Sequence, residues 1–239
     1  MLSAAAGFAS WPVVETLLAM GADPTVTATN GLDPLMTMTW AHRHPENITR
    51  WCEKFPTWNF SRRAGSAGAT VATFALMSGP DSMATVDALV KGGVDPLAFT
   101  AHSGTTLLHN AAANKDADGE LVRYLLRVPG VKALVDTPQR GQTFKWRAQF
   151  VVVRLLVRLG NTKALLQAVS EWPKMTPLMT AARNGNAAVI KVLVEEGGAQ
   201  ITLRNARGKT ALDLLVGGEN ALEESRRLLG GGAAATGAE

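Results

Sequence analysis

The chain has 239 residues, of which 46% are hydrophobic and 18% charged, and this composition excludes an intrinsically disordered chain. Its single cysteine excludes an internal disulfide and favours a reducing, intracellular compartment, cytoplasmic or nuclear. The net charge of +4 is too weak by itself to favour a nucleic-acid partner. The most apolar run, FVVVRLLVRLG at 150–160, contains two arginines and is too short to cross a bilayer, so no membrane span is expected.

Residues 2–21 (LSAAAGFASWPVVETLLAMG) predict two short helices. The apolar residues of the second recur on one helical face: Val13, Val14, Leu17 and Leu18. Leu2, Ala5 and Phe8 make the outer side of the first helix apolar. We therefore expect either that the sequence is a fragment or that another segment or protein covers this end.

Residues 39–58 (TWAHRHPENITRWCEKFPTW) hold three of the six tryptophans, two of the four histidines and the only cysteine. His42, His44 and Cys52 could ligate a metal, but no fourth ligand is evident. The apolar residues fall at i, i+3, i+4 and i+7 of a helix starting at Pro45: Ile48, Trp51, Cys52 and Phe55. We therefore expect Trp51 and Cys52 in the core, both histidines in a turn, and no metal.

Two further helix pairs follow, with longer turns between their helices near residues 80 and 116. Acidic and hydroxyl side chains in these turns are good N-cap residues, so Asp81 or Ser82 and Asp116 or Asp118 are expected to cap the second helices.

Residues 144–159 predict one unusually long helix, ending at Gly160. No acidic residue occurs between Asp136 and Glu171, whereas six basic residues do: Arg140, Lys145, Arg147, Arg154, Arg158 and Lys163, called here the basic strip. Arg147, Arg154 and Arg158 share one helical face. The side expected to be buried consists of Val152, Val153, Leu155, Leu156 and Leu159. The strip is either a solvated outer face or a docking strip for an acidic partner.

Residues 174–215 (KMTPLMTAARNGNAAVIKVLVEEGGAQITLRNARGKTALDLL) combine a Thr-Pro start, an Ala-Ala pair, a glycine and a second amphipathic helix. The same start recurs at intervals of 37, 36, 37, 33 and 34 residues, at Asp33, Thr70, Thr106, Thr143, Thr176 and Thr210. A period of this length is typical of stacked repeats.

This pattern resembles the ankyrin repeat, roughly G-x-T-P-L-H-x-A-A-x-x-G followed by V-V-x-x-L-L and G-A-D. The resemblance implies an all-α solenoid of stacked helix–turn–helix units with short β-hairpin or turn fingers. It covers residues 1–229 as about six to seven repeats, the first truncated and the one near 141–173 irregular, with a missing or shrunken finger after it. Residues 230–239 would be a flexible tail. His109 is expected to brace the turn at Thr106.

The resemblance further implies a non-catalytic module that binds another protein through its concave groove and fingertips. Carried over by position, the groove candidates, some of which could pack between repeats instead, are Phe8, Trp40, Phe74, Met77, Asn110, Asn114, Phe150 and Arg183. The fingertip candidates are Phe99, His102, Arg140, Arg204 and Arg207.

The alternative function is binding of an anionic surface, whether phosphoprotein, acidic lipid or nucleic acid, through Lys145, Arg147, Arg154 and Arg158 of the basic strip. The chain has no phosphate-binding loop, nucleophile elbow or zinc-binding helix motif. We therefore expect no enzymatic activity, no small-molecule substrate, no cofactor and no metal.

Overall fold

The computed structural model describes residues 2–41, 43–76, 82–160, 163, 169–216 and 219–230. The turn residue His42, the groove candidate Met77, the cap candidate Asp81 and the expected tail from residue 231 onward lie outside these residues. Within the described part, regular structure is helical, and the β pairing recorded is one isolated bridge between Ala64 and Ala69. The chain divides into two compact units, residues 1–101 and 102–239.

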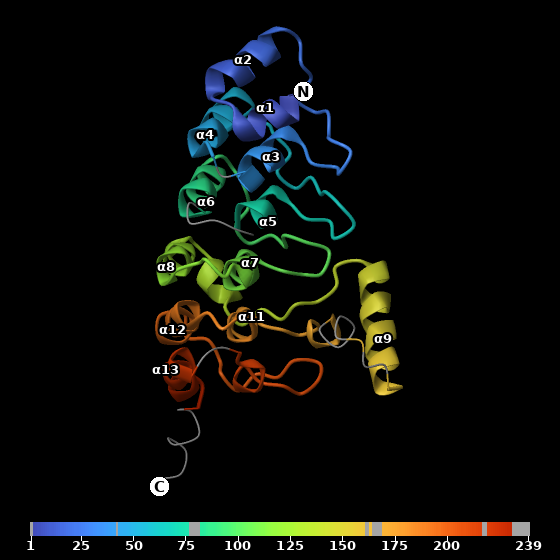
Figure 1. The fold of residues 1–239 in the computed structure, drawn as a ribbon, viewed down its shortest axis with the longest axis vertical. Helices are drawn as coiled ribbons and strands as arrows, with labels where there is room; N and C mark the ends of the chain where they lie inside the picture. The colour runs from blue at the N-terminus through green and yellow to red at the C-terminus, as the bar shows by residue number, and fades with distance from the viewer. Residues whose placement is uncertain are drawn as a thin grey trace. The chain divides into compact units, whose positions relative to one another are not determined.

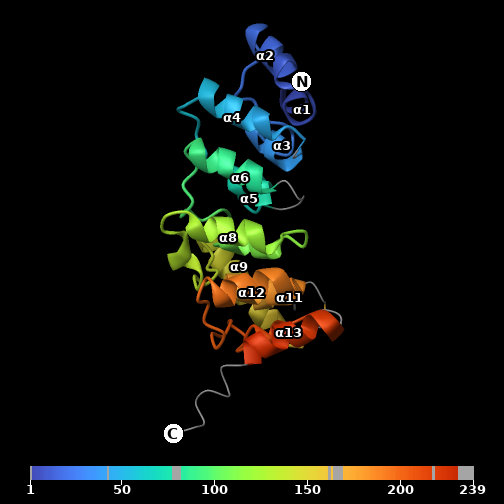
Figure 2. The same cartoon turned by 90° about the vertical axis from the view of Figure 1, so that its left-hand side faces the viewer.

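Unit 1 (residues 1–101) is built from antiparallel helix pairs (Figure 1): α1 Leu2–Phe8 with α2 Trp11–Ala19, α3 Pro34–Ala41 with α4 Pro45–Lys54, and α5 Val71–Leu76 with α6 Ser82–Lys91. The first helix of each pair packs on the first helix of the next, and α4 packs on α2 and α6 (Figure 2). Each pair thereby buries its apolar stripe against a neighbour, because a pair this short cannot bury that stripe alone.

The core of unit 1 confirms the packing interpretation of residues 39–58. Trp51 is completely buried, and its ring lies 4.7 Å from that of Phe55 and 5.2 Å from that of Trp58, measured between centroids. Ile48 and Cys52 on the same face of α4 are buried as well. The apolar periodicity of α4 therefore faces α2 and α6, as the spacing predicted.

The first helices approach one another closely at Gly7. A Cβ atom at Gly7 would lie 2.9 Å from the Cγ2 atom of Thr37, so a side chain there would force α1 away from α3. Small residues at this contact let the two helices pack at short range.

Unit 2 (residues 102–239) contains α7 Leu107–Ala113, α8 Gly119–Arg127, the 3₁₀ turn η1 Val131–Leu134, α9 Phe144–Arg158, α11 Pro177–Asn184, α12 Ala187–Glu195, the 3₁₀ turn η2 Leu212–Leu214 and α13 Glu219–Gly230. Here α7 packs on α11 and α11 on η2, while α8 packs on α12 and α12 on α13. The fold class is therefore the predicted one, with all-α helix pairs stacked side by side and turn fingers between them.

The six residues at which the repeats were predicted to start, Asp33, Thr70, Thr106, Thr143, Thr176 and Thr210, are called here the slot residues. They stand at the helix starts. Asp33 Oδ1 accepts from the Met36 N–H (2.8 Å) at the start of α3. Thr143 and Thr176 cap α9 and α11, accepting from the N–H groups three residues on. Asp118, rather than Asp116, caps α8 by accepting from the Leu121 N–H (3.1 Å). Side-chain acceptors at these positions satisfy N–H groups that a helix start leaves unpaired.

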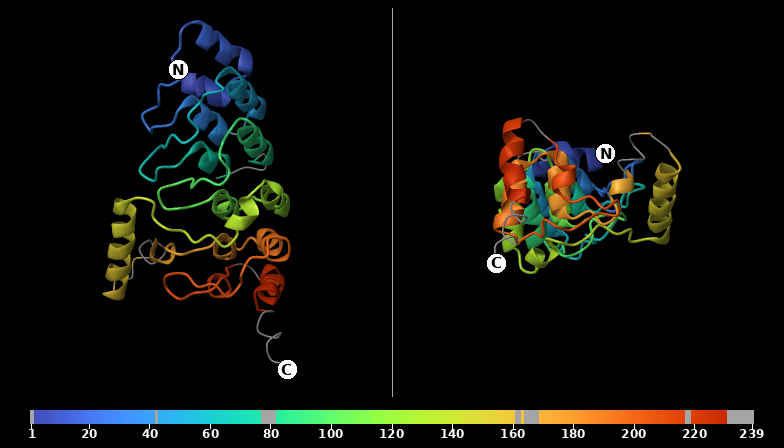
Figure 3. Two further views of the ribbon diagram at one scale, coloured as in Figure 1. Left: turned by 180° about the vertical axis from the view of Figure 1, so that it is seen from behind. Right: turned by 90° about the horizontal axis from the view of Figure 1, so that it is seen from below.

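The repeat near 141–173, which the sequence prediction counted within the array as an irregular repeat, is not a member of the stack. The helix pair α11–α12 packs directly on α7–α8. Asn184 Nδ2 donates to the Ala112 carbonyl (3.2 Å), and Asn186 Nδ2 donates to the carbonyl of Ala117 (2.8 Å). Figures 1 and 3 show α9 set apart from these pairs and running along the direction in which they stack.

Backbone hydrogen bonds close the base of the segment that carries α9, residues 140–173, called here the excursion. The Gln139 N–H donates to the Met175 carbonyl (2.7 Å), and the Lys174 N–H donates to the Gln139 carbonyl (2.8 Å). Lys174 has a φ of 65°, a left-handed conformation that suits a tight change of direction. The excursion is thus an insertion that is closed at its base. The stack continues from α7–α8 directly to α11–α12 without it.

None of the helices in the described part combines the length and the apolarity needed to cross a bilayer.

Candidate functional site

Two groove candidates of unit 1 are exposed at corresponding ends of touching helices. Phe8 at the end of α1 is 51% exposed, and Trp40 near the end of α3 is 50% exposed. The close contact of Gly7 with Thr37 holds these helix ends together. The guanidinium carbon of Arg43 lies 5.4 Å from the centroid of the Phe8 ring. We call Phe8, Trp40 and Arg43 the aromatic patch.

Arg43 did not stand out in the sequence, where it lies in the turn between α3 and α4. A guanidinium over an aromatic face is attracted by the ring quadrupole, an effect of roughly 0.5–1 kcal/mol at an exposed site. No spacing rule links residue 43 to residue 8, because the two belong to different helix pairs. Only the packing of α1 on α3 brings them together.

The other groove candidates are less accessible. Phe74 is half-buried in α5, and Arg183 is half-buried in α11. Asn110 and Asn114 are buried, with 8% and 2% exposure. They are therefore interior residues of unit 2, and the expectation that they face a groove is wrong.

Phe150 is also wrongly placed by the repeat register. It is 5% exposed, and its ring lies 5.6 Å from that of Trp146, measured between centroids. The register assumed that α9 occupies an inner-helix position in the stack. Because α9 belongs to the excursion, Phe150 is an interior residue beside Trp146 and lines no groove.

The finger candidates of unit 1 and of the start of unit 2 are held by local bonds. In unit 1, Arg63 donates to the carbonyls of Gly68 (2.8 Å) and of the half-buried Phe99 (3.1 Å). In unit 2, the carbonyl of the half-buried His102 accepts from the Gln142 N–H (2.8 Å), and Arg140 is exposed. Both fingers are thus ordered loops that leave cationic side chains at their surface.

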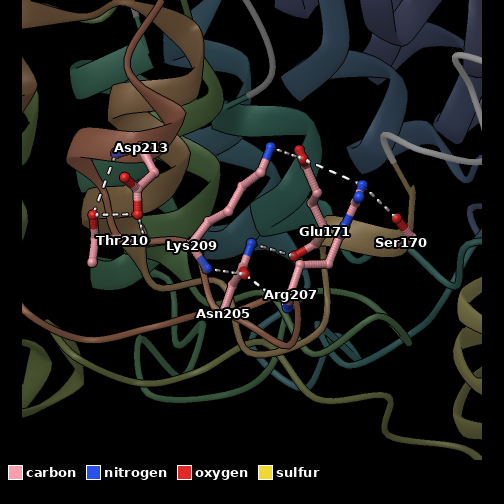
Figure 4. Close-up of polar contacts among 7 residues, drawn as sticks. All are labelled: Ser170, Glu171, Asn205, Arg207, Lys209, Thr210 and Asp213. Carbon is pink, nitrogen blue, oxygen red and sulfur yellow. Dashed lines mark hydrogen bonds and ion pairs between the residues drawn. The ribbon is translucent and has the colours of Figure 1, made fainter. Parts of the chain in front are cut away.

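The last finger is tied to the end of the excursion through Glu171 (Figure 4). Its side chain is only 12% exposed and accepts from Lys209 Nζ (2.6 Å), with Arg207 Nη1 at 3.7 Å. Arg207 also donates to Ser170 Oγ (3.4 Å), and Asn205 Nδ2 donates to the Glu171 carbonyl (3.3 Å). The fingertip candidate Arg207 is therefore partly engaged within unit 2.

The other candidate in this finger, Arg204, is exposed and donates to the Gly208 carbonyl (2.7 Å). At the base of the finger, Asp213 accepts from the backbone N–H (2.8 Å) and hydroxyl (2.9 Å) of Thr210. These bonds, the backbone one first, lower the pKa of Asp213 below its ordinary value. Thr210 therefore keeps the slot role predicted for it, although η2 replaces an α-helix there.

The basic strip is largely at the surface. Arg140, Lys145, Arg147 and Arg158 are exposed, as is Lys163, while Arg154 is half-buried. Arg147 donates from Nε to the Gly141 carbonyl (2.9 Å), which holds its side chain along the start of α9.

The side of α9 expected to be buried is largely exposed. Of the five residues assigned to that side, only Val153 is buried. The packed face of α9 consists instead of Trp146, Phe150, Val153 and Val157, which are buried or half-buried. The opposite side, called here the outer face, comprises the exposed residues Phe144, Val151, Val152, Leu155, Leu156 and Leu159. α9 therefore has two apolar faces, and only one of them is covered.

A small hollow of about 280 Å³ adjoins the arginine side of α9, and we call it the arginine hollow. Its lining residues are Arg154, Val157, Arg158, Ser170, Ala206 and Arg207. Three arginines are thus among the lining residues of one concavity. Glu171 is the acidic neighbour, already paired with Lys209 and Arg207.

Cys52 and His109, whose side chains are chemically reactive, are both buried in the protein. Burial raises the pKa of the Cys52 thiol to about 11, so it is a protonated, inert thiol at neutral pH. Burial lowers the pKa of His109 to about 4. Its Nδ1 accepts from the Thr106 N–H (3.2 Å) and its Nε2 donates to the Met175 carbonyl (3.1 Å), as expected of a bracing residue. Among the described residues, no three His, Cys, Asp or Glu side chains are grouped to hold a metal ion.

Comparisons with known proteins agree with this architecture. Residues 173–215 match the family described as "Ankyrin repeats (many copies)". No curated protein matches the chain. A chain from the complex of the Bd0816 predatory endopeptidase of Bdellovibrio bacteriovorus with the immunity protein Bd3460 superposes with a TM-score of 0.64, at 22% identity and over 96% of each chain.

The ankyrin repeat domain of human ASB11 superposes with a TM-score of 0.52, at 22% identity, over 95% of this chain and 96% of that domain. At this identity the likeness concerns the fold. The capped helix pairs, the turn fingers and the matched repeat at 173–215 together show that the chain has the ankyrin-repeat fold.

Proposed function

We propose that the chain is a non-catalytic protein-binding module whose partner contacts the aromatic patch of unit 1. Ankyrin repeats generally mediate protein–protein interaction. The single observation that carries the proposal is that Phe8 and Trp40 are exposed beside Arg43. Tryptophan and arginine are the residues on which interface binding energy most often concentrates. A reduced, buried Cys52 supports an intracellular setting.

The patch suits a partner that offers an apolar side chain flanked by an acidic group. An aromatic ring that is half exposed in the free protein gains burial when a partner covers it, and a central contact of this kind contributes about 2 kcal/mol or more. The exposed cations Arg140 and Arg204 would add weaker, salt-sensitive contacts at the fingers.

The test is affinity capture from a cell extract with the wild-type chain, followed by binding measurements with the recovered partner. Trp40→Ala should weaken that partner's affinity about thirtyfold, equivalent to about 2 kcal/mol. Met20→Ala is the matched control, because Met20 is 78% exposed at the end of α2 and lies outside the patch. Equal affinity of both variants for the partner would reject the patch.

A second candidate function, binding of an anionic surface by the basic strip, is favoured by a separate observation. Lys145, Arg147 and Arg158 are exposed on α9, and no acidic residue lies between Asp136 and Glu171 to neutralise them. Retention on heparin that falls steeply with salt is expected. Retention that survives the combined substitution of Arg147, Arg154 and Arg158 by glutamate would eliminate this function.

A further inference from the structure

The outer face of α9 is a continuous apolar band at the surface of unit 2. At about 100° per residue, its six members fall within an arc of about 140° of the helix, opposite the packed face. Phe144 is 87% exposed, Leu159 75% and Leu155 53%. Contiguous exposed apolar side chains of this kind mark interaction sites in folded proteins.

Cations lie along one border of this band and near the other. Arg147, Arg154 and Arg158 fall within an arc of about 40° along one border, and Lys145 lies inside the band close to the opposite border. No acidic residue occurs on α9 at all. An apolar face with aromatic and leucine side chains, bordered by lysine and arginine, is the pattern of a helix that lies in a membrane interface.

The arginine hollow adds a receptor for a phosphate group at the same border. Arg154 and Arg158 line it from α9, and Arg207 and the buried Ser170 line it from the other side. Guanidinium groups bind phosphate through paired N–H donors, so three arginines among the lining residues of one concavity favour a phosphate oxyanion. The hollow and the outer face are therefore adjacent sites for the two ends of a phospholipid.

The placement of α9 leaves room for a flat surface. Figures 1 and 3 show it as the outermost helix on its side of unit 2, away from α7, α8, α11 and α12. Its 15 residues give it a length of about 22 Å. The outer face has three arginines along one border and Lys145 close to the other, which matches a layer of anionic headgroups better than the single acidic flank of a partner helix.

We propose that α9 docks unit 2 on a membrane containing anionic phospholipid, with the outer face in the headgroup–acyl boundary and a lipid phosphate in the arginine hollow. The proposal rests on the second candidate function and names its partner. It does not depend on the aromatic patch of unit 1.

The experiment is co-sedimentation of the full chain with vesicles of mixed phosphatidylcholine and phosphatidylserine, and with vesicles of phosphatidylcholine alone. The wild type should bind the mixed vesicles, release on added salt and show little affinity for pure phosphatidylcholine. Leu155→Glu should reduce the partition coefficient more than tenfold, and Arg158→Gln about fivefold, the effect of one cation near an anionic surface. Val216→Glu is the matched control, because Val216 is 60% exposed in unit 2 and lies outside α9.

A second readout locates the contact. Leu155→Cys, labelled with an environment-sensitive dye, should shift its emission to the blue on mixed vesicles, whereas the same dye at Val216→Cys should not. The buried Cys52 of the unmodified chain serves as the labelling blank. Circular dichroism and thermal melting should be unchanged in Leu155→Glu, because this side chain is exposed.

Several results would overturn the proposal: no binding of the wild type to mixed vesicles at low salt, equal binding to phosphatidylcholine alone, or undiminished binding of Leu155→Glu. A wild-type dimer in light scattering that Leu155→Glu dissociates would assign the outer face to a second copy instead. Trp40→Ala should bind vesicles like the wild type, so failure of the aromatic patch and failure of membrane docking are distinguishable. Salt-sensitive heparin retention without vesicle binding would leave the second function standing and reject the lipid.

Discussion

The helices α3 and α9 start from the same local signal and end in different environments. Each begins after a capping residue, Asp33 and Thr143, whose side-chain oxygen accepts from a backbone N–H three residues on. α3 has 8 residues, six of them buried, and packs on α1, α4 and α5. α9 has 15 residues, of which only Phe150 and Val153 are buried.

The difference shows that a cap and a period decide where a helix starts but not whether it enters the stack. Entry requires close approach, which small residues provide where Gly7 meets Thr37. α9 carries Gln149 and Val152 where the repeat pattern places an alanine and a glycine, and it is about twice as long as α3. Inner helices of the stack could not approach it closely, so α7 and α11 pack on each other instead.

The largest expected effect separates a stack leucine from an excursion leucine. Leu35→Ala should lower the free energy of unfolding by about 2–5 kcal/mol, because Leu35 is fully buried and the substitution leaves a cavity. Leu155→Ala should change it by about 0.5 kcal/mol or less, because Leu155 is 53% exposed. Urea denaturation followed by circular dichroism measures both. Equal losses would mean that α9 is part of the stack after all.

Acid should weaken the junction between α7 and α11 through His109. The pKa of folded His109 is about 4, below its ordinary 6.5, so the neutral form stabilises the fold. Stability from this group is present above pH 6.5 and is lost as the pH falls to 4, by at most about 3 kcal/mol. His109→Gln should flatten that part of the stability–pH curve. An identical curve for the variant would show that the histidine is not linked to folding.

The base of the excursion can be opened at Gly104. A Cβ there would lie 2.0 Å from the Arg140 carbonyl oxygen, and the residue has a φ of 85°. Gly104→Ala should therefore cost about 2 kcal/mol or more and speed proteolysis within 140–173. Gly198→Ala is the matched control, because Gly198 has a φ of 73° but open space around it. Its cost should be only that of the backbone conformation, about 1 kcal/mol. Equal effects of the two variants would argue against a tight contact at residue 104.

The smallest expected effect compares two helix caps. Thr176→Ala removes the cap of α11 within the stack and should cost about 1 kcal/mol of global stability. Thr143→Ala removes the equivalent cap of α9, and its cost should appear mainly as faster amide exchange at the start of α9. Hydrogen exchange with mass spectrometry distinguishes the two. Faster exchange throughout α7 and α11 in Thr143→Ala would contradict the separation of α9 from the stack.

Much of the fold could be predicted from particular residues. The slot residues Asp33, Thr143 and Thr176, and the heptad-like spacing that buries Trp51 and Cys52, act within one helix or turn. The interval from Thr106 to Thr176 is close to two repeat lengths, so counting periods alone hid the fact that the excursion leaves the stack. Among the groove candidates Phe8 and Trp40 are exposed, so their role stays a prediction, whereas Asn110, Asn114 and Phe150 are interior.

The sequence by itself determined the helix starts, the glycine turns and the all-α repeat architecture, because caps, turns and apolar periodicity act over a few neighbouring residues. Only the tertiary structure decided which helices touch. The contact of Arg43 with Phe8, the hollow between α9 and the last finger, and the uncovered outer face of α9 all follow from that choice. An apolar stripe shows that a helix can be buried, but the partner that buries it is set by packing between distant segments.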